Sequence, residues 1–331
     1  MYDQCDLAPI SFGAKSYCEV QKMLFEINQF LIQSDIELPL KSVISTSLDN
    51  RKQIKVFRLN KINIHSEYYC VLSKNSNIDV YLYDNVSIVN YKSIDVKLEI
   101  SSSYIAYSSD QPEIAILPIL SMGIAIVFNY NGMSPIHAAG FYYNGNAYVL
   151  AGDSGSGKSS LLASIISNNK EISLICDDLL PIISKDKKIF SVGSNGFIKQ
   201  WKYNIINNPW LDSLEWEPLQ LGVDKYYSYC DTTINSLSKI SCMFVLNPME
   251  CKMQTYFQEI CDYKEKATTI FDKYYCKNFM YRDKSFLNNI QNGLCFSNSV
   301  KIYNAFYTAK CPKDSLAKDF IEFIEYTNEH R

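Results

Sequence analysis

Apolar and polar residues repeat with two different periods along this chain. Near the N-terminus a helical spacing predicts one amphipathic helix, with the apolar positions Val20, Met23, Leu24, Ile27, Phe30 and Leu31. From about residue 52 to 109 the period is two, which is typical of strands. In "VKLEI", residues 96–100, we expect the three apolar side chains to face inward and Lys97 and Glu99 to face outward. "YDNV", residues 83–86, separates two such runs and predicts a tight turn.

Two further apolar patterns predict helices. The run "IAILPILSMGIAIVF", residues 114–128, is too short to span a bilayer and contains Pro118 and Gly123, so we expect a buried helix. Near the C-terminus, "DSLAKDFIEFIEY" follows Pro312 and begins with a capping Asp314 or Ser315. Its apolar face, which we expect to cover a sheet, consists of Leu316, Phe320, Phe323 and Ile324.

The second part of the chain mixes strand and helix patterns, which predicts an α/β fold (α+β, with a mixed sheet). We place the domain boundary between about residues 110 and 130. Residues 1–128 are then a β-rich domain that packs or docks a substrate or partner. Residues 129–331 are the α/β domain, which carries the candidate chemistry.

The segment "YVLAGDSGSGKSS", residues 148–160, contains the pattern G-x-x-x-x-G-K-[ST]. Its glycines let successive backbone N–H groups point at anionic oxygens, and a following helix adds its positive end. A strand pattern, "NAYVLA", precedes it and a helix pattern, "SSLLASIIS", follows it, which is the setting of a phosphate-binding P-loop. A plain glycine-rich turn is the alternative. The predicted nucleotide-binding residues are Gly152, Asp153, Ser154, Gly155, Ser156, Gly157, Lys158, Ser159 and Ser160.

Two acids follow a short apolar run in "ISLICDD", residues 172–178. The run predicts a buried strand, and acids at its C-terminal end face the same crevice as the phosphate loop. Adjacent side chains of a strand point to opposite faces unless the strand has already ended. One of Asp177 and Asp178 is therefore expected near a metal and the other near a substrate hydroxyl. A plain metal-binding Asp177 with a solvated neighbour is the alternative.

His137 is placed beside the loop by the segment between them. Asn144-Gly145 separates two apolar runs, which is the strongest short hairpin signal. A two-residue turn there pairs Tyr143 with Asn146, and this register puts His137 opposite Gly152. We therefore expect a functional His137, the alternative being a packed core histidine.

These parts together resemble the HPr serine kinase/phosphorylase family, whose P-loop core is shared with phosphoenolpyruvate carboxykinase. The matching pieces are His137, "GDSGSGKSS" and "ICDDLLPI". The chain is most similar to the stand-alone HPr-kinase-like proteins of peptide-biosynthesis clusters, including lasso-peptide kinases. Further matching segments are "FIKQWKYN" and Lys225 in "VDKYY". The resemblance is specific over residues 136–202 and loose elsewhere.

The resemblance implies an ATP-dependent kinase. Lys158 and the loop would hold the terminal phosphates of ATP, Ser159 and Asp177 would hold Mg²⁺, and Asp178 would accept the proton of the acceptor hydroxyl. His137 would lie near the transferred phosphoryl group. Three lysines are candidates for charge neutralisation or acceptor binding: Lys199, Lys202 and Lys225. Two departures are that "GFIKQWK" lacks the family's metal-binding Glu, and that the N-terminal part is unlike that of true HPr kinases.

Composition narrows the partners. The net charge of -3 makes nucleic acid an unexpected partner. The N-terminus lacks the basic-then-apolar order of residues that is typical of a signal peptide. Eleven cysteines without a C-x-x-C pair predict reduced, mostly buried thiols in a cytoplasmic protein. No N-K-x-D or L-S-G-G-Q motif occurs. We therefore expect a kinase acting on a hydroxyl of a peptide, protein or small metabolite. A nucleotide-gated binding module and a simple NTPase are the alternatives, and a homo-oligomer is left open.

Overall fold

The computed structural model describes most of the chain from residue 53 onward. The described residues are 10–11, 53–58, 61–63, 69–74, 77–83, 86–102, 104–110, 114, 118–191, 193, 196–206, 208, 211, 214–219, 223–230, 233–234, 237–275 and 286–329. The helix predicted over residues 20–31 lies outside them, as do the central residues of the turn predicted in "YDNV".

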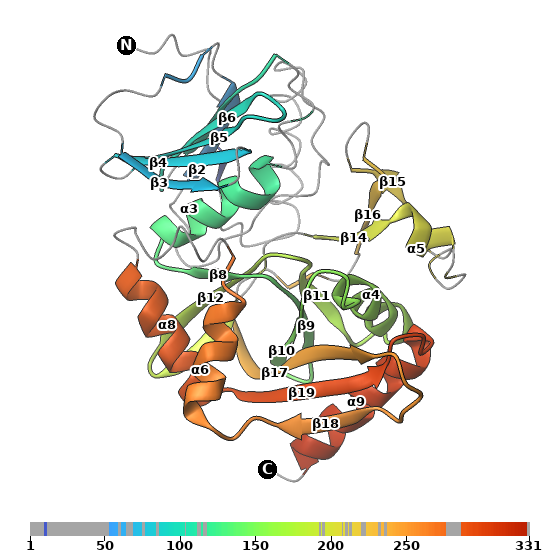
Figure 1. Ribbon diagram of the computed structural model, residues 1–331. Coiled ribbons are helices and arrows are strands. Elements are labelled where there is room, and N and C mark those ends of the chain that lie inside the picture. The colour runs from blue at the N-terminus through green and yellow to red at the C-terminus, as the bar shows by residue number, and fades with distance from the viewer. Residues whose placement is uncertain are drawn as a thin grey trace.

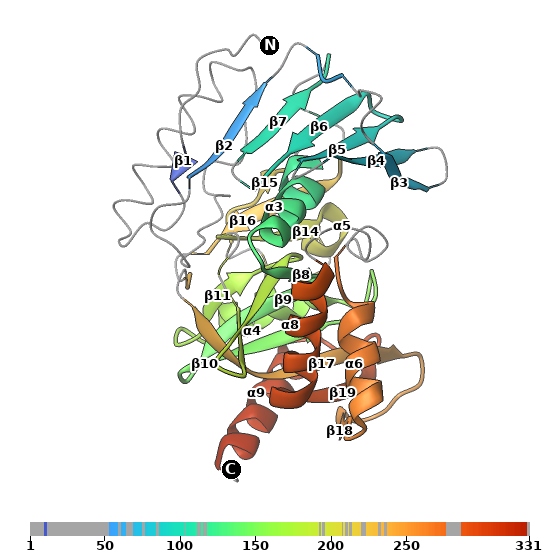
Figure 2. The same ribbon diagram turned by 90° about the vertical axis from the view of Figure 1, so that its left-hand side faces the viewer.

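A first sheet forms the N-terminal part of the described structure (Figures 1 and 2). In spatial order its strands are β1 (Ile10–Ser11), β2 (Gln53–Arg58), β7 (Tyr104–Ser108), β6 (Val96–Ile100), β5 (Val86–Tyr91), β4 (Ile78–Tyr83) and β3 (Tyr69–Lys74). Neighbours are antiparallel except β2 and β7. The sheet confirms the β-rich character predicted for this part. The pairing of Tyr83 with Val86 is also that of the predicted two-residue turn.

Glu99 differs from the prediction that the alternation of strand residues gave for its side chain. Its side chain was expected to face solvent, but the residue is only 5% exposed. One carboxylate oxygen accepts a hydrogen bond from the hydroxyl of Tyr104, 2.7 Å away. Alternation assigns Glu99 to the face opposite Leu98, and that face of the sheet is covered here instead of solvated.

The apolar run after this sheet forms a helix, as predicted, over the described residues. A π-helical turn, η2 (Ile119–Gly123), continues into α3 (Ile124–Tyr130). Residues 124–129 are all buried. They join the core of the first sheet to that of the second, since Leu98, Phe128 and Ile136 belong to one continuous apolar cluster.

The second sheet is mixed and curls around the centre of the lower part in Figure 1. Its path is β11 (Ser173–Cys176), β9 (Ala138–Tyr143), β10 (Asn146–Ala151), β17 (Ser238–Met249), β13 (Lys188–Ser191), β12 (Leu180–Lys185) and β8 (Ser134–Ile136). β17 also pairs with β19 (Lys301–Thr308), which pairs with β18 (Tyr256–Glu259). Because β10, β17 and β19 are parallel, their C-terminal ends lie at one edge of the sheet. The molecule is therefore a mixed α/β structure.

Helices cover the second sheet. α4 (Lys158–Asn168) packs against α9 (Lys313–Glu329), and α6 (Tyr263–Asp272) packs against α8 (Phe286–Ser299). Leu316, Phe320 and Ile324 of α9 are buried, so the predicted apolar face is confirmed. The predicted cap is wrong, because α9 already begins at Lys313. Asp314 lies in its first turn, where its carboxylate accepts a hydrogen bond from Ser164 of α4 (2.8 Å).

Buried amides fix the strand that leads to His137. Asn289 of α8 donates to the side-chain oxygen of Asn129 at 2.8 Å and accepts a hydrogen bond from Ser134 of β8 at 2.7 Å. Asn292 donates to the Ser134 hydroxyl and accepts from the backbone N–H of Ser184 on β12. Since buried polar groups are costly unless paired, this network holds α3, β8, β12 and α8 in one arrangement.

A small third sheet projects beside the second one (Figure 1). Its order is β14 (Phe197–Trp201), β16 (Lys225–Tyr229) and β15 (Glu217–Pro218), and α5 (Lys202–Ile206) follows β14 directly. The rings of Phe197, Tyr227 and Tyr229 pack edge to face in its centre. This sheet matters for the site because β14 carries Lys199 and β16 carries Lys225.

Thiols and apolar helices were also predicted. The seven cysteines whose side chains are described are all free, but only Cys176 and Cys242 among them are buried, while Cys251 and Cys261 are exposed. The expectation of mostly buried thiols is therefore wrong for this part of the chain. Among the helices of the described residues, none has both the length and the apolar character needed to cross a membrane.

Candidate active site

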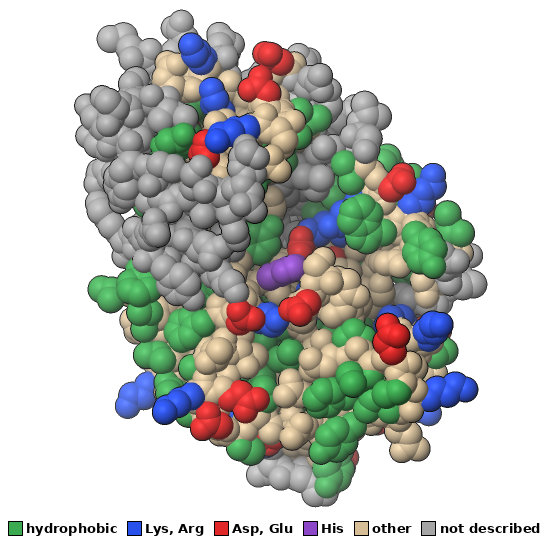
Figure 3. Space-filling model, in the orientation of Figure 1, with side chains coloured by type: hydrophobic (Ala, Val, Ile, Leu, Met, Phe, Trp, Pro, Cys, Tyr) green, Lys and Arg blue, Asp and Glu red, His purple; other side chains and the backbone are tan. Residues whose placement is uncertain are grey.

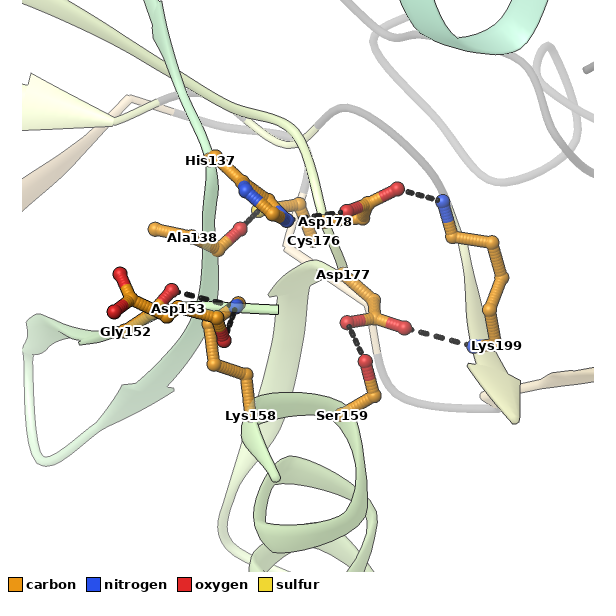
Figure 4. Close-up of polar contacts among 10 residues, drawn as sticks. All are labelled: His137, Ala138, Gly152, Asp153, Lys158, Ser159, Cys176, Asp177, Asp178 and Lys199. Carbon is orange, nitrogen blue, oxygen red and sulfur yellow. Dashed lines mark hydrogen bonds and ion pairs between the residues drawn. The ribbon is translucent and has the colours of Figure 1, made fainter. Parts of the chain in front are cut away.

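The glycine loop, residues 152–157, joins β10 to the N-terminus of α4. Gly155 and Gly157 have φ angles of +85° and +91°, a backbone region that side-chain-bearing residues rarely adopt. The loop turns back on itself, so that Nζ of Lys158 donates to the carbonyl oxygens of Gly152 (2.8 Å) and Asp153 (3.1 Å) (Figure 4). The ammonium group is thereby held inside the loop, where burial lowers the pKa of Lys158.

Asp177 lies behind the loop and is fully buried. Its Oδ1 accepts a hydrogen bond from the hydroxyl of Ser159 at 2.8 Å, and its Oδ2 accepts one from the backbone N–H of Lys199 at 2.8 Å (Figure 4). Burial raises the pKa of Asp177 and outweighs the opposing charge of Lys199. A buried carboxylate of this kind gains from a cation brought close to it.

Asp178 points elsewhere, because the strand ends at Cys176. Its backbone is left-handed, with a φ of +79°. Its Oδ1 lies 3.0 Å from Nε2 of His137, and its Oδ2 lies 2.6 Å from Nζ of Lys199 (Figure 4). The two neighbouring carboxylates therefore face different side chains, Asp177 the hydroxyl of Ser159 and Asp178 the imidazole of His137, while Lys199 contacts both.

Opposing effects act on the carboxyl of Asp178. Burial raises its pKa, but the charge of Lys199 and the hydrogen bond from His137 prevail and hold the pKa well below its usual range. The side chain is still 26% exposed. Asp178 is therefore an ionised carboxylate at neutral pH that remains accessible from outside.

His137 reaches this position through the hairpin. β9 and β10 pair Tyr143 with Asn146 and Ala138 with Ala151, as the predicted register requires, and His137 and Gly152 are the next residues beyond this ladder. Its N–H donates to the carbonyl oxygen of Lys273 at 2.7 Å, and its ring packs edge-on against Tyr275. In Figure 3 the described histidine lies at the surface of a hollow, beside acidic and basic side chains.

That hollow opens into a cleft of about 560 Å³. The glycine loop contributes Gly152, Asp153 and Ser154 to its wall, and the segment after α6 contributes Lys273 and Tyr275. The opposite wall comes from the first sheet and the helix after it, with Ile78, Tyr91, Ser121 and Met122. The cleft thus lies where the N-terminal sheet meets the loop, with His137 on its floor.

The three candidate lysines differ in where the structure places them. Lys199 contacts Asp178 directly. Nζ of Lys225 lies 5.5 Å from the ring centroid of Trp201. Burial lowers the pKa of Lys225, and the negative charges of Asp178 and Asp177 are close enough to oppose this shift. Lys202 is exposed at the start of α5, and within the described structure no hydrogen bond or ion pair joins its side chain to the acids. Only the first two are brought to the site.

Three residues that lie close to the loop were not predicted from the sequence. Lys273 donates to Oδ1 of Asp153 at 2.9 Å. The hydroxyl of Tyr307 donates to the carbonyl oxygen of Ser156. Nζ of Lys313 lies 3.2 Å from the position that a Cβ atom on Gly157 would occupy. These residues come from elements distant in sequence and belong to no motif, so no signal in the sequence marks them.

The donor atoms fit Mg²⁺ held jointly with phosphate. In the described part of the chain no group of three His, Cys, Asp or Glu side chains is arranged to hold a metal by itself. Ser159 and Asp177 nevertheless place two oxygen donors 2.8 Å apart, and Mg²⁺ commonly takes one or two protein oxygens and completes its shell with phosphates and water. The Ser156 hydroxyl, buried without a hydrogen-bond partner, is a further group that a phosphate oxygen would satisfy.

No protein-family model matches this chain, and no curated protein matches it. Among solved structures, the Hpr(Ser) kinase/phosphatase from Coxiella burnetii is similar over 59% of this chain and 98% of that one, with 11% identity and a TM-score of 0.33. A TM-score this low is compatible with a distant relation in fold and carries nothing about the chemistry, which rests on the geometry of the site.

Proposed function

We propose that this protein is an ATP-dependent kinase that transfers the γ-phosphoryl group to a hydroxyl, with Asp178 as the general base. The observation that carries the proposal is the position of Asp178. Its carboxylate is partly exposed, in contact with His137 and Lys199, and next to a loop that encloses the ammonium of Lys158. Phosphoryl transfer needs this combination of positive charge, an accessible carboxylate and fixed positions.

In the nucleotide-bound state, Lys158 would exchange its two carbonyl partners for phosphate oxygens. The loop amides and the N-terminus of α4 would bind the same phosphates. Ser159 and Asp177 would hold Mg²⁺, which would neutralise charge on the phosphates. The ion would also offset the cost of keeping Asp177 buried.

Asp178 would then act on the acceptor. Its carboxylate accepts from His137 and Lys199 but has about four lone-pair sites, so it can also accept the proton of an incoming alcohol. The alcohol oxygen forms a bond to the γ-phosphorus while the bond from that phosphorus to the β–γ bridging oxygen breaks. ADP leaves, and Asp178 takes the proton and then releases it to solvent. A positioned base of this kind typically contributes about 10²- to 10⁴-fold in rate.

The acceptor would enter through the cleft above His137. Its walls are mixed, with Ile78, Met122 and Tyr91 on one side and Lys273 on the other. A serine or threonine within a peptide or protein fits such a wall, as does a small hydroxylated metabolite. In this proposal the N-terminal sheet takes part in acceptor binding, because it forms one side of the cleft.

A nucleotide-gated binding module is the second candidate, and one observation favours it. Both carboxylate oxygens of Asp178 are already engaged, which would also be expected of a purely structural ion pair. Such a module would retain ATP without consuming it. A simple NTPase would instead release inorganic phosphate.

The fate of the γ-phosphate separates these functions. The full chain is incubated with Mg²⁺ and γ-labelled ATP, with a panel of Ser- and Thr-containing peptides and with a small-metabolite extract, and the label is separated into covalent product, inorganic phosphate and retained ATP. A kinase places label on an acceptor, and Lys158→Ala abolishes this. Label that appears only as inorganic phosphate, or that stays in bound ATP, contradicts the kinase proposal.

A further inference from the structure

Lys313 lies against the glycine loop, on the side of Gly157. Its Nζ is 3.2 Å from the position of a Cβ atom built on Gly157, and its Cε is 3.6 Å from it. The same ammonium lies 5.1 Å from the ring centroid of Tyr307. The Tyr307 hydroxyl donates to the carbonyl oxygen of Ser156, so this ring connects the lysine to the loop. Lys313 is therefore held in place beside the loop.

The charge of Lys313 has no acidic counterpart in the described structure. No carboxylate of the described residues lies within ion-pair distance of it, and the adjacent Asp314 bonds to Ser164 and Asn168 instead. Burial lowers the pKa of Lys313. A partly buried cation without a counter-charge is costly, and an anion bound nearby would relieve that cost.

The topology explains why this lysine meets the loop. The loop follows β10, and the segment that carries Lys313 follows β19, with β17 between these two parallel strands. In open α/β sheets, ligands bind outside the carboxyl ends of such strands. Lys313 and the glycine loop thus lie at the same edge of the sheet.

Lys313 lies at a different part of that edge from the acidic pair. The reacting end is marked by His137, Asp178 and the ammonium of Lys158, while Lys313 lies beside Gly157, where α4 begins. An anion at Lys313 is then a part of the donor other than the transferred γ-phosphoryl group. Triphosphate tails extend beyond the reacting phosphorus to an α-phosphate and a ribose.

Resting on the proposed nucleotide site, we propose that Lys313 binds the α-phosphate of the donor. The donor class would then be a nucleoside di- or triphosphate, as opposed to pyrophosphate or inorganic polyphosphate, which have no α-phosphate attached to a nucleoside. Lys313 would bind and orient the donor and would take no part in the bond-breaking step. Tyr307 would act through Lys313 as a positioning residue.

Calorimetric titration of the full chain tests this inference. Mg²⁺·ADP and Mg²⁺·pyrophosphate are titrated into the wild type, Lys313→Met, Lys313→Arg and the control Lys318→Met, which changes an exposed lysine of the same helix. Lys313→Met is expected to weaken ADP binding by about 10- to 100-fold, the range for one hydrogen bond to a charged group. The arginine variant should retain most of the affinity and the control all of it.

The titration with Mg²⁺·pyrophosphate shows which phosphate Lys313 contacts. The affinity for pyrophosphate is expected to stay within about twofold in Lys313→Met, because a contact to the α-phosphate of a nucleotide also depends on the nucleoside that fixes this phosphate in place. Equal ADP affinity in Lys313→Met and wild type would overturn the inference while leaving the nucleotide site intact. Equal weakening of both ligands would overturn the α-phosphate assignment. A wild type that binds no nucleotide would instead refute the proposed function, and this inference with it.

Discussion

Nε2 of His137 and Oδ1 of Asp178 lie 3.0 Å apart, although one residue precedes strand β9 and the other follows strand β11. The two strands are antiparallel neighbours, so the start of β9 lies beside the end of β11, and the hairpin ladder ends one residue short of His137 and Gly152. The carboxylate is turned toward the histidine by its left-handed backbone. This contact connects the strand that leads to the hairpin before the phosphate loop with the acidic pair.

His137→Asn tests whether the histidine serves the reaction or the core. We expect phosphoryl transfer to fall by about 10²-fold, the lower end of the contribution of acid–base groups, because Asp178 loses one of its two fixed partners. Binding of Mg²⁺·ADP should not change, since the imidazole does not contact the loop lysine. A variant that unfolds at lower temperature but transfers phosphate at the normal rate would assign His137 to packing alone.

Lys199→Met tests the buried ion pair. Removing the ammonium leaves Asp178 without its closest cation. Because Asp178 is 26% exposed, we expect a cost of about 1–3 kcal/mol in the free energy of unfolding, less than for a fully buried pair. Lys202→Met is the matched control, because that lysine is exposed on the next element, and its effect should stay within about 0.5 kcal/mol. Denaturant unfolding of the two variants measures both values, and equal stabilities would contradict a structural role for the pair.

Lys199→Met also shifts the pH dependence of phosphoryl transfer in a defined direction. Burial raises the pKa of Asp178, while Lys199 and His137 together hold it below its unfolded value, so its stabilisation is present above the unfolded pKa and is lost as the pH falls through the folded pKa. Without Lys199 the folded pKa rises. The acidic limb of the rate profile should therefore move to higher pH in Lys199→Met and remain in place in Lys202→Met. A shift toward lower pH would contradict the assignment of this limb to Asp178.

Ser159→Ala tests the metal site without altering the carboxylate. The variant removes the oxygen that lies 2.8 Å from Oδ1 of Asp177. We expect the gain in ADP affinity on adding Mg²⁺ to shrink by about 10- to 100-fold, the range seen when the partners of a metal ligand are lost. Affinity for ADP in EDTA should be unchanged. Ser167→Ala, at the far end of the same helix, should behave as wild type, and an unaltered Mg²⁺ effect in Ser159→Ala would place the ion elsewhere.

Phe320→Ala tests how α9 is attached. Phe320 is fully buried, and its ring lies 5.0 Å from that of Phe244 and 4.9 Å from that of Phe257. Loss of a buried phenylalanine side chain typically costs about 3–5 kcal/mol in the free energy of unfolding. Tyr326→Ala, which changes an exposed ring on the same helix, should cost less than about 1 kcal/mol. Comparable costs for the two variants would show that the helix is loosely packed.

Local patterns predicted much of the local structure. Asn144-Gly145 predicted both the hairpin and its register, which pairs Tyr143 with Asn146 and Ala138 with Ala151, because a two-residue turn leaves a single register. The strand that ends before Asp177 followed from a short apolar run, and the helix after Lys158 followed from its apolar spacing. These features depend only on residues that are close together in the chain, so they can be predicted from the sequence.

Tertiary contacts could not be predicted in this way. Lys273 and Lys313 approach the loop from the ends of distant elements, and each is an ordinary lysine in its own sequence context. Glu99 was assigned to solvent because alternation reports opposite faces and does not report what covers them. The roles assigned to Asp177, Asp178 and the lysines remain predictions.

Asp178→Asn provides the most direct measurement of the central claim. The amide keeps the size of the carboxylate but cannot accept the proton of an alcohol, so Mg²⁺·ATP binding should stay within about twofold while phosphoryl transfer from γ-labelled ATP falls by about 10²- to 10⁴-fold. Transfer at the wild-type rate in this variant, with ATP still bound, would contradict Asp178 as the base and the account built on it.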